Sequence, residues 1–108
     1  MVLTSFVQIQ NEKRRKIIKY IKANPNDLNY LKKLPLFFKY DKKLFLFLIT
    51  VNDRYFKYYG SNFLKTNIHF LKRAYKINSS IIECLCDDRI RIQLQEIIYI
   101  NIMNIMNN

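Results

Sequence analysis

The side chains best suited to metal binding or nucleophilic catalysis are one histidine, His69, and two cysteines, Cys84 and Cys86. A structural zinc site takes four cysteine or histidine ligands in paired clusters, and this set supplies three. Catalysis by a nucleophile and a base needs the two groups within hydrogen-bond reach. No nucleophile or carboxylate stands at a spacing from His69 that matches such a pair. We therefore expect no enzyme activity, no metal and no cofactor, with both cysteines acting as small apolar fillers.

A run of basic residues near the N-terminus is the strongest functional signal. Residues 1–82 carry 17 basic and 4 acidic side chains, a net charge of +13, whereas residues 83–108 carry 2 and 4, a net charge of −2. Such a field favours acidic partners such as nucleic acid or anionic lipid. The candidate contacts to the phosphates of RNA or DNA are Lys13, Arg14, Arg15, Lys16 and Lys19. The alternative is the solvated face of an amphipathic helix over residues 11–22, with Ile17, Ile18 and Ile21 on its apolar stripe.

Aromatic and basic side chains alternate in residues 54–59, Arg-Tyr-Phe-Lys-Tyr-Tyr. Aromatic rings beside lysine and arginine are the ingredients of a stacking platform for single-stranded nucleic acid. The competing interpretation, which we favour, is that the rings pack between helices. Gly60 follows directly and is predicted to adopt the left-handed conformation past a helix C-terminus.

The elements that position these residues recur along the chain. The pairs Asn26-Asp27, Asn52-Asp53 and Asn78-Ser79 lie 26 residues apart, and each predicts a turn followed by a helix N-cap. Asp41 and Asn67, also 26 apart, begin a second and longer kind of helix. The helical spacing predicts burial of Leu44, Leu48, Phe70, Leu71 and Ala74. A fixed period of this length is typical of a helical array whose copies must stack.

This pattern resembles a family of tandem helical repeats of unknown function, with a period near 25 residues and the form D-x-x-x-V-x-x-A-V-x-x-N-x-x-x-L-x-Y-A. Asp41, Asn52 and Tyr58 stand at the Asp, Asn and Tyr of one copy, and the next copy matches at Asn67, Ala74 and Asn78. The match covers about residues 17–92 and departs where Leu48, Tyr59 and Leu85 replace alanine. The resemblance implies a fold and no activity.

The fold expected from these patterns is all-α: a single domain over residues 1–108, built as a short α-solenoid-like array of two to three degenerate helix-turn-helix repeats. One glycine and two prolines are too few for a β-sandwich or barrel. The repeat core is expected over about 17–99, with a last helix from Arg89 to Tyr99. Residues 1–10 are expected to form an extended or helical lead-in. The Ile/Met/Asn tail over 100–108 is expected to extend the last helix or to fray, with fraying beyond about Asn104. Its Ile and Met residues could also mark a partner contact or a further repeat.

Two functions fit these expectations. The repeat favours a protein-interaction or scaffold module, and the charge favours a nucleic-acid-associated protein or small ribonucleoprotein component. No run of apolar residues reaches the ~18 needed to span a bilayer. Two cysteines and no secretory signal pattern predict an intracellular, reducing compartment such as the cytoplasm or nucleus.

Overall fold

The computed structural model describes residues 2–107, with side chains from Phe6 onward. Every regular element over these residues is helical and none is a strand, so the predicted all-α class is confirmed. The elements in chain order are α1 (Val2–Ala23), η1 (Leu28–Lys33), η2 (Leu36–Tyr40), α2 (Lys42–Val51), α3 (Arg54–Tyr59), α4 (Asn62–Lys65), α5 (Ile68–Ile77), η3 (Ser79–Cys84) and α6 (Asp88–Met106), where η marks a 3-10 helix.

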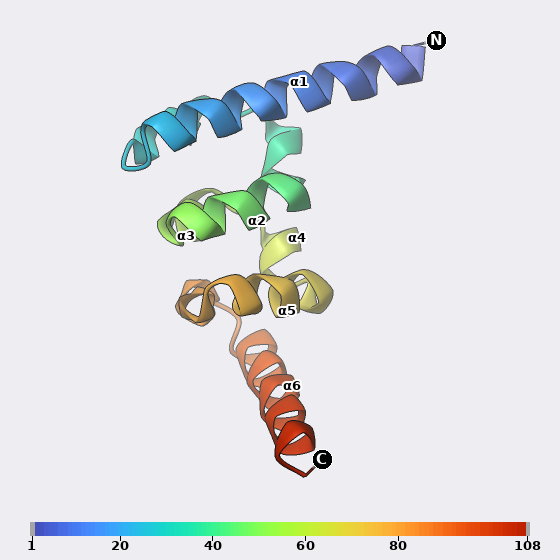
Figure 1. Ribbon diagram of the computed structural model, residues 1–108, viewed down its shortest axis with the longest axis vertical. Helices are drawn as coiled ribbons and strands as arrows, with labels where there is room; N and C mark the ends of the chain where they lie inside the picture. Colours follow the sequence, from blue (N-terminus) through green and yellow to red (C-terminus); the bar gives the residue numbers. More distant parts are fainter. Residues whose placement is uncertain (1, 108) are drawn as a thin grey trace.

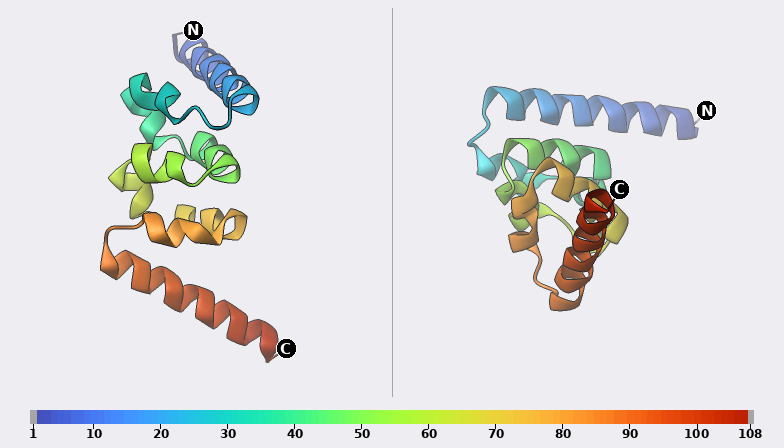
Figure 2. Two further views of the ribbon diagram at one scale, coloured as in Figure 1. Left: turned by 90° about the vertical axis from the view of Figure 1, so that its left-hand side faces the viewer. Right: turned by 60° about the horizontal axis from the view of Figure 1, so that its bottom comes forward.

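The longer helices form a column. Figure 1 shows α1, α2 and α5 one above another and running in the same direction, with α6 at the opposite end from α1. The left view of Figure 2 shows the short segments η1, η2, α3 and α4 returning the chain along one side of this column. The whole measures 49 × 34 × 25 Å. Because α2 contacts both α1 and α5, it lies at the centre.

The hydrophobic core is centred on α2. Phe45 and Ile49 of this helix are fully buried. Phe56 of α3 joins neighbouring layers, since its ring centroid lies 6.1 Å from that of Phe45 and 5.7 Å from that of Phe70. Such tilted and edge-on arrangements are favourable for aromatic pairs. The predicted burial is confirmed for Leu44, Leu48, Phe70, Leu71 and Ala74, none of which is more than 2% exposed.

Polar caps define the two ten-residue helices α2 and α5. The Asp41 side chain accepts a hydrogen bond from the Leu44 amide, and the Asn67 side chain accepts one from the Phe70 amide, each at 3.0 Å. Both bonds satisfy an amide that has no partner within the first helical turn. The extended backbone of Asn52 and Asn78 ends the two helices. The helix starts predicted at Asp41 and Asn67 are therefore confirmed.

Asp27 and Asp53 stand at the N-cap positions of η1 and α3, as predicted, whereas the predicted cap Ser79 does not. The Asp27 and Asp53 side chains make no cap bond to η1 or α3, and Ser79 is the first residue of η3. Asn52 and Asn78 perform this role, because their side chains accept from the amides two residues further on, at 2.9 and 3.1 Å. An Asn side chain reaches its own backbone in this way as an Asx-turn. Asn26 lies in the turn before η1, as predicted.

Gly60 does not adopt the predicted left-handed conformation, because its φ of −65° and ψ of 137° are open to any residue. The glycine is required by a close approach instead. A Cβ at this position would lie 2.6 Å from Cδ1 of Phe56 and 2.8 Å from its carbonyl oxygen. Contacts this short do not occur in relaxed structures, so a larger residue at position 60 would force Phe56 or the backbone to shift.

Both terminal helices include the segments whose conformation the sequence left open. α1 begins at Val2, so the helical alternative for the lead-in holds. α6 continues through Met106, so the tail extends the helix, and the fraying expected after Asn104 is not seen through Met106. Asp87 caps α6 by accepting from the Arg89 amide at 2.9 Å, and no glycine or proline follows to interrupt the helix.

Candidate functional site

The basic residues of α1 divide into two groups. Arg14 turns toward α2, where its Nε donates to Oδ2 of Asp41 at 2.7 Å and its Nη1 donates to Oδ1 of Asn11 at 2.8 Å. Its side chain is 19% exposed and that of Asp41 is 10% exposed. The guanidinium therefore fastens α1 to the start of α2, and this structural pairing replaces the phosphate contact predicted for Arg14.

The remaining predicted phosphate contacts, Lys13, Arg15, Lys16 and Lys19, are exposed on α1. Arg15 and Lys19 lie four residues apart, so they share one face of the helix with Glu12. Helix α1 is one end of the column in Figure 1. Its outward face is polar and basic, which is typical of the outer face of a terminal element in a stacked protein.

The side chains of Asp27 and Asp53 make hydrogen bonds to residues of other helices in place of cap bonds. The Tyr20 hydroxyl donates to Asp27, and the Ser80 hydroxyl donates to Asp53 across a separation of 27 residues. The bond to Asp27, followed by burial, raises the pKa of Tyr20 above its ordinary value. These carboxylates therefore have internal partners and are structural groups.

The aromatic segment over 54–59 is mostly turned inward. Tyr55 and Phe56 are fully buried, whereas Tyr58 is 61% exposed. The Tyr55 hydroxyl donates to the Pro25 carbonyl at 3.0 Å, and burial raises the pKa of Tyr55. A stacking platform needs several accessible rings. Packing between layers, the interpretation favoured from the sequence, accounts for two of the rings.

The candidate nucleophiles are separated in the fold. Cys84 is buried and its thiol donates to the Asp53 carbonyl oxygen at 3.7 Å, while Cys86 is exposed. Burial, followed by the Asp53 carboxylate, raises the pKa of the Cys84 thiol, which disfavours the reactive thiolate. His69 is exposed on α5. Within the described part of the chain, no three His, Cys, Asp or Glu residues are grouped to hold a metal ion.

Helix α6 carries a continuous run of exposed apolar side chains. Residues 97–106 read Ile-Ile-Tyr-Ile-Asn-Ile-Met-Asn-Ile-Met, eight apolar residues and two asparagines. Leu94 is fully buried against the column, but from residue 99 to 107 every residue is exposed. The exposed apolar side chains of this helix are Ile92, Tyr99, Ile100, Ile102, Met103, Ile105 and Met106, which are 37–76% exposed. A helix that is apolar around its whole circumference is normally buried.

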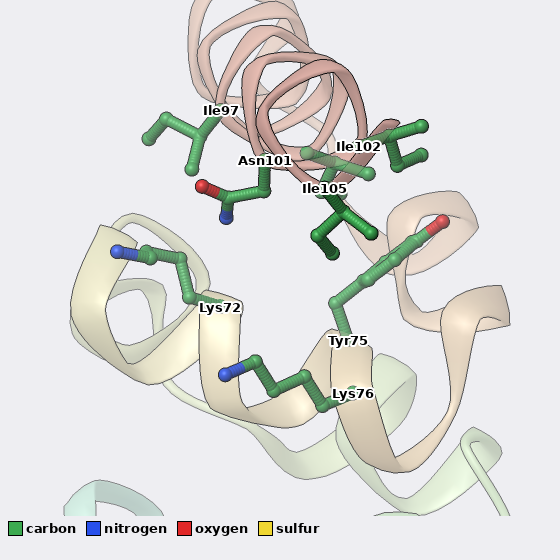
Figure 3. A pocket seen from close by; sticks show the side chains of 8 residues that line it. Lys72, Tyr75, Lys76, Ile97, Asn101, Ile102 and Ile105 are labelled. Carbon is green, nitrogen blue, oxygen red and sulfur yellow. The ribbon is translucent and has the colours of Figure 1, made fainter. Parts of the chain in front are cut away.

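A hollow of about 220 Å³ separates the end of α6 from α5. Figure 3 shows Ile97, Asn101 and Ile105 directed from α6 toward α5, from which Lys72, Tyr75 and Lys76 extend. Because the two helices diverge, the inward face of α6 is also only partly covered. The exposed α6 surface, the seven apolar side chains named above, thus offers apolar contact that no basic residue interrupts.

The sequence contained a signal for this surface in its Ile/Met/Asn tail, for which extension of the helix and a partner contact were both among the predictions. A continuous helix through Met106 turns separate apolar residues into one surface.

No helix in the described residues is long and apolar enough to cross a membrane. Comparison of the chain with protein-family models, curated proteins and solved structures finds no match.

Proposed function

We propose that this chain is a protein-interaction module, built as a short α-solenoid-like stack of degenerate repeats, and that α6 is its docking element. The observation that carries the proposal is the exposed α6 surface. Contiguous apolar patches larger than a few hundred Å² are rare on monomeric proteins and mark interaction sites. The proposed role is not enzymatic and requires no cofactor.

Recurring helix starts support the repeat interpretation. Pro35, Ser61 and Asp87 stand at the N-caps of η2, α4 and α6, again 26 residues apart. After the N-cap Ser61 and the short helix α4, Asn67 starts the longer helix α5. The residue 26 positions after Asn67 is Gln93, which is a weak N-cap. The helix that begins after Asp87 therefore continues past Gln93, and the counterparts of α4 and α5 form the single helix α6. This fusion explains the greater length of α6.

The two ends of such a stack have different requirements. A terminal element needs a polar outer face if it is to be stable in water. The outer face of α1 meets this requirement with Glu12, Arg15 and Lys19, whereas α6 presents Ile92, Tyr99 and their apolar neighbours. The α6 end is therefore the one that gains most from a protein partner.

The proposal is tested by site-specific photo-cross-linking in cells that express the chain. A photoreactive phenylalanine analogue replaces Tyr99, and the matched control places it at Tyr58, which is 61% exposed on α3 while Tyr99 is 63% exposed on α6. We expect discrete protein adducts, either to another protein or to the chain itself, from position 99 and none in common with position 58. Identical adduct patterns from both positions, or none from position 99, would contradict the proposal.

Nucleic-acid binding is the second candidate, favoured by the net charge of +13 on residues 1–82 and by the exposure of Arg15, Lys16 and Lys19 on α1. Binding of this kind proceeds by counterion release, so affinity should fall steeply with salt and show little base preference. Arg14 is left intact in the test because its substitution would break the pair with Asp41.

Replacing Arg15, Lys16 and Lys19 together with Gln should flatten the slope of log affinity against log salt by about two to three units, near one per lost phosphate contact. Fluorescence anisotropy with a short RNA and a short DNA duplex measures this slope. A variant with the same net charge, in which Lys42, Lys43 and Lys57 become Gln, should keep most of it. No binding at low salt, or equal slopes for both variants, would remove α1 as a nucleic-acid contact.

A further inference from the structure

We infer that the exposed α6 surface binds a second copy of this chain, with the two α6 helices packed antiparallel about a twofold axis. The inference rests on the proposed function and specifies the partner of the same surface. It follows from the spacing of apolar residues on α6, from the distribution of charge along the column and from the composition of that surface.

One row of side chains on α6 has the spacing of a helix-packing seam. Ile92, Tyr99, Met103 and Met106 are separated by seven, four and three residues, so they share one side of the helix. The row covers 14 residues, a length of about 21 Å. A twofold contact uses the same patch on both partners, so a continuous apolar row is complementary to itself.

Glu96 determines the direction of the pairing. It stands in the same row, four residues after Ile92 and three before Tyr99. Parallel helices in register would place the two Glu96 carboxylates together in the seam. In an antiparallel pair that crosses between Tyr99 and Ile100, the two Glu96 positions lie seven residues apart, or about 10 Å along the axis. Antiparallel pairing therefore avoids contact between like charges.

Repulsion between the basic residues of two chains also opposes self-association through most of the remaining surface. Residues 97–106 carry no ionisable charge, whereas residues 1–82 carry a net charge of +13. Because α1 and α6 are opposite ends of a column 49 Å long (Figure 1), a contact through α6 holds the two N-terminal ends far apart. That separation is several times the Debye length of about 8 Å at physiological ionic strength. Other faces would bring like charges together.

The composition of the exposed α6 surface suits the centre of an interface, and four of its apolar side chains lie in the seam. A standard interface takes about 800 Å² from each partner, with an apolar centre and few charges. Seven apolar side chains on α6 are between 37% and 76% exposed. A second group of exposed apolar side chains joins Phe6 of α1 to Phe37 of η2, whose ring centroids lie 6.4 Å apart, and it lies within the basic segment. Contact of α6 with α6 therefore opposes less charge than contact through that group.

A membrane surface fits the same helix less well. Helices that lie in a bilayer interface carry lysine and arginine on their polar face. Between Arg91 and Met106 this helix has no basic residue, and its polar residues are amides and Glu96. A second copy needs no basic residue at this place.

The test is the mass of the purified chain in solution, by sedimentation equilibrium or by size exclusion with light scattering. We expect twice the 13.2 kDa of one chain at micromolar concentration. The association should persist or strengthen from about 0.1 M to about 1 M salt, as the Debye length falls from about 10 to about 3 Å and repulsion between the basic ends is screened. A single 13.2 kDa species at about 100 µM, where even weak dimers form, overturns the inference.

Matched variants locate the contact. Tyr99→Glu and Met103→Glu should each raise the dimer dissociation constant at least tenfold, because each places a carboxylate in the apolar seam. Leu36→Glu, at a residue that is 68% exposed on η2, should leave it unchanged. All three residues are exposed, so each variant is expected to fold. An unchanged circular dichroism spectrum would show that the fold persists. Equal loss in all three variants overturns the inference.

Three further outcomes would also contradict the inference. Mass that rises continuously with concentration beyond the dimer indicates head-to-tail contacts between unlike faces. Binding of a monomer to phosphatidylserine vesicles that is lost in Tyr99→Glu assigns the surface to lipid. A monomer in solution together with Tyr99-dependent protein adducts in cells would contradict the second copy as partner while leaving the protein-interaction function in place.

Discussion

The ion pair between Arg14 and Asp41 offers the sharpest test of how α1 is held. Asp41 has two roles, since it caps α2 by accepting from the Leu44 amide at 3.0 Å and it accepts from Arg14 at 2.7 Å. Loss of a cap costs about 1 kcal/mol. The two side chains of the pair are 19% and 10% exposed, so the pair is intermediate between exposed and buried ion pairs. Exposed pairs contribute about 0–1 kcal/mol to stability, and disruption of a buried pair costs about 3–5 kcal/mol. We therefore assign a cost of about 2 kcal/mol to the disruption of this pair.

The two roles can be separated by substitution. Asn67 makes the same cap bond at 3.0 Å with an amide oxygen, so Asp41→Asn should keep the cap and lose only the charge. We expect Asp41→Asn to lower the free energy of unfolding by about 2 kcal/mol and Asp41→Ala by about 3. Arg14→Met retains the apolar stem of the side chain and removes the guanidinium.

Urea denaturation of Asp41→Asn, Arg14→Met and the double variant gives the coupling energy, which we expect to be about 1–2 kcal/mol. A control, Lys13→Met, removes a neighbouring exposed charge and should change the free energy of unfolding by less than about 0.5 kcal/mol. If Asp41→Asn is as stable as the parent chain, or if the coupling is within error of zero, the pair contributes nothing. In that case α1 is held by the burial of Ile17 and Ile21 alone.

Three more predictions concern the core and the thiols. Phe70→Ala should lower the free energy of unfolding by about 3–5 kcal/mol, and an unchanged denaturation midpoint would contradict its burial. Gly60→Ala should cost about 1–3 kcal/mol, because the added Cβ would lie 2.6 Å from Cδ1 of Phe56; a neutral result in the same assay would refute this contact. At neutral pH a thiol reagent followed by mass spectrometry should label Cys86 well before Cys84, since burial raises the pKa of Cys84, and equal rates would be evidence against that environment.

The sequence alone determined the features that depend on neighbours along the chain. Asp41 and Asn67 start their helices because a short polar side chain can reach an amide three residues ahead, whatever the rest of the molecule does. The burial of Leu44 and Phe70 follows from helical spacing in the same way. The all-α class required nothing more than these local signals together with the scarcity of glycine and proline.

Predictions failed where two uses of a side chain compete. Asp27 has good N-cap chemistry, but the Tyr20 hydroxyl from the end of α1 occupies its carboxylate. Asp53 is held likewise by Ser80. Each carboxylate can bond either to the amides of its own helix or to a hydroxyl of another helix, and the fold determines which of these groups lies within reach.

The candidate site depended still more on tertiary structure. The sequence grouped Arg14 with Arg15 and Lys16 as phosphate contacts, yet Asp41, 27 residues away, takes Arg14 into the column. The exposed apolar residues of α6 were visible as a composition, but their exposure follows from the path of the helix beyond α5. Charge and hydrophobicity are properties of residues, whereas availability to a partner depends on which groups the fold has already brought into contact.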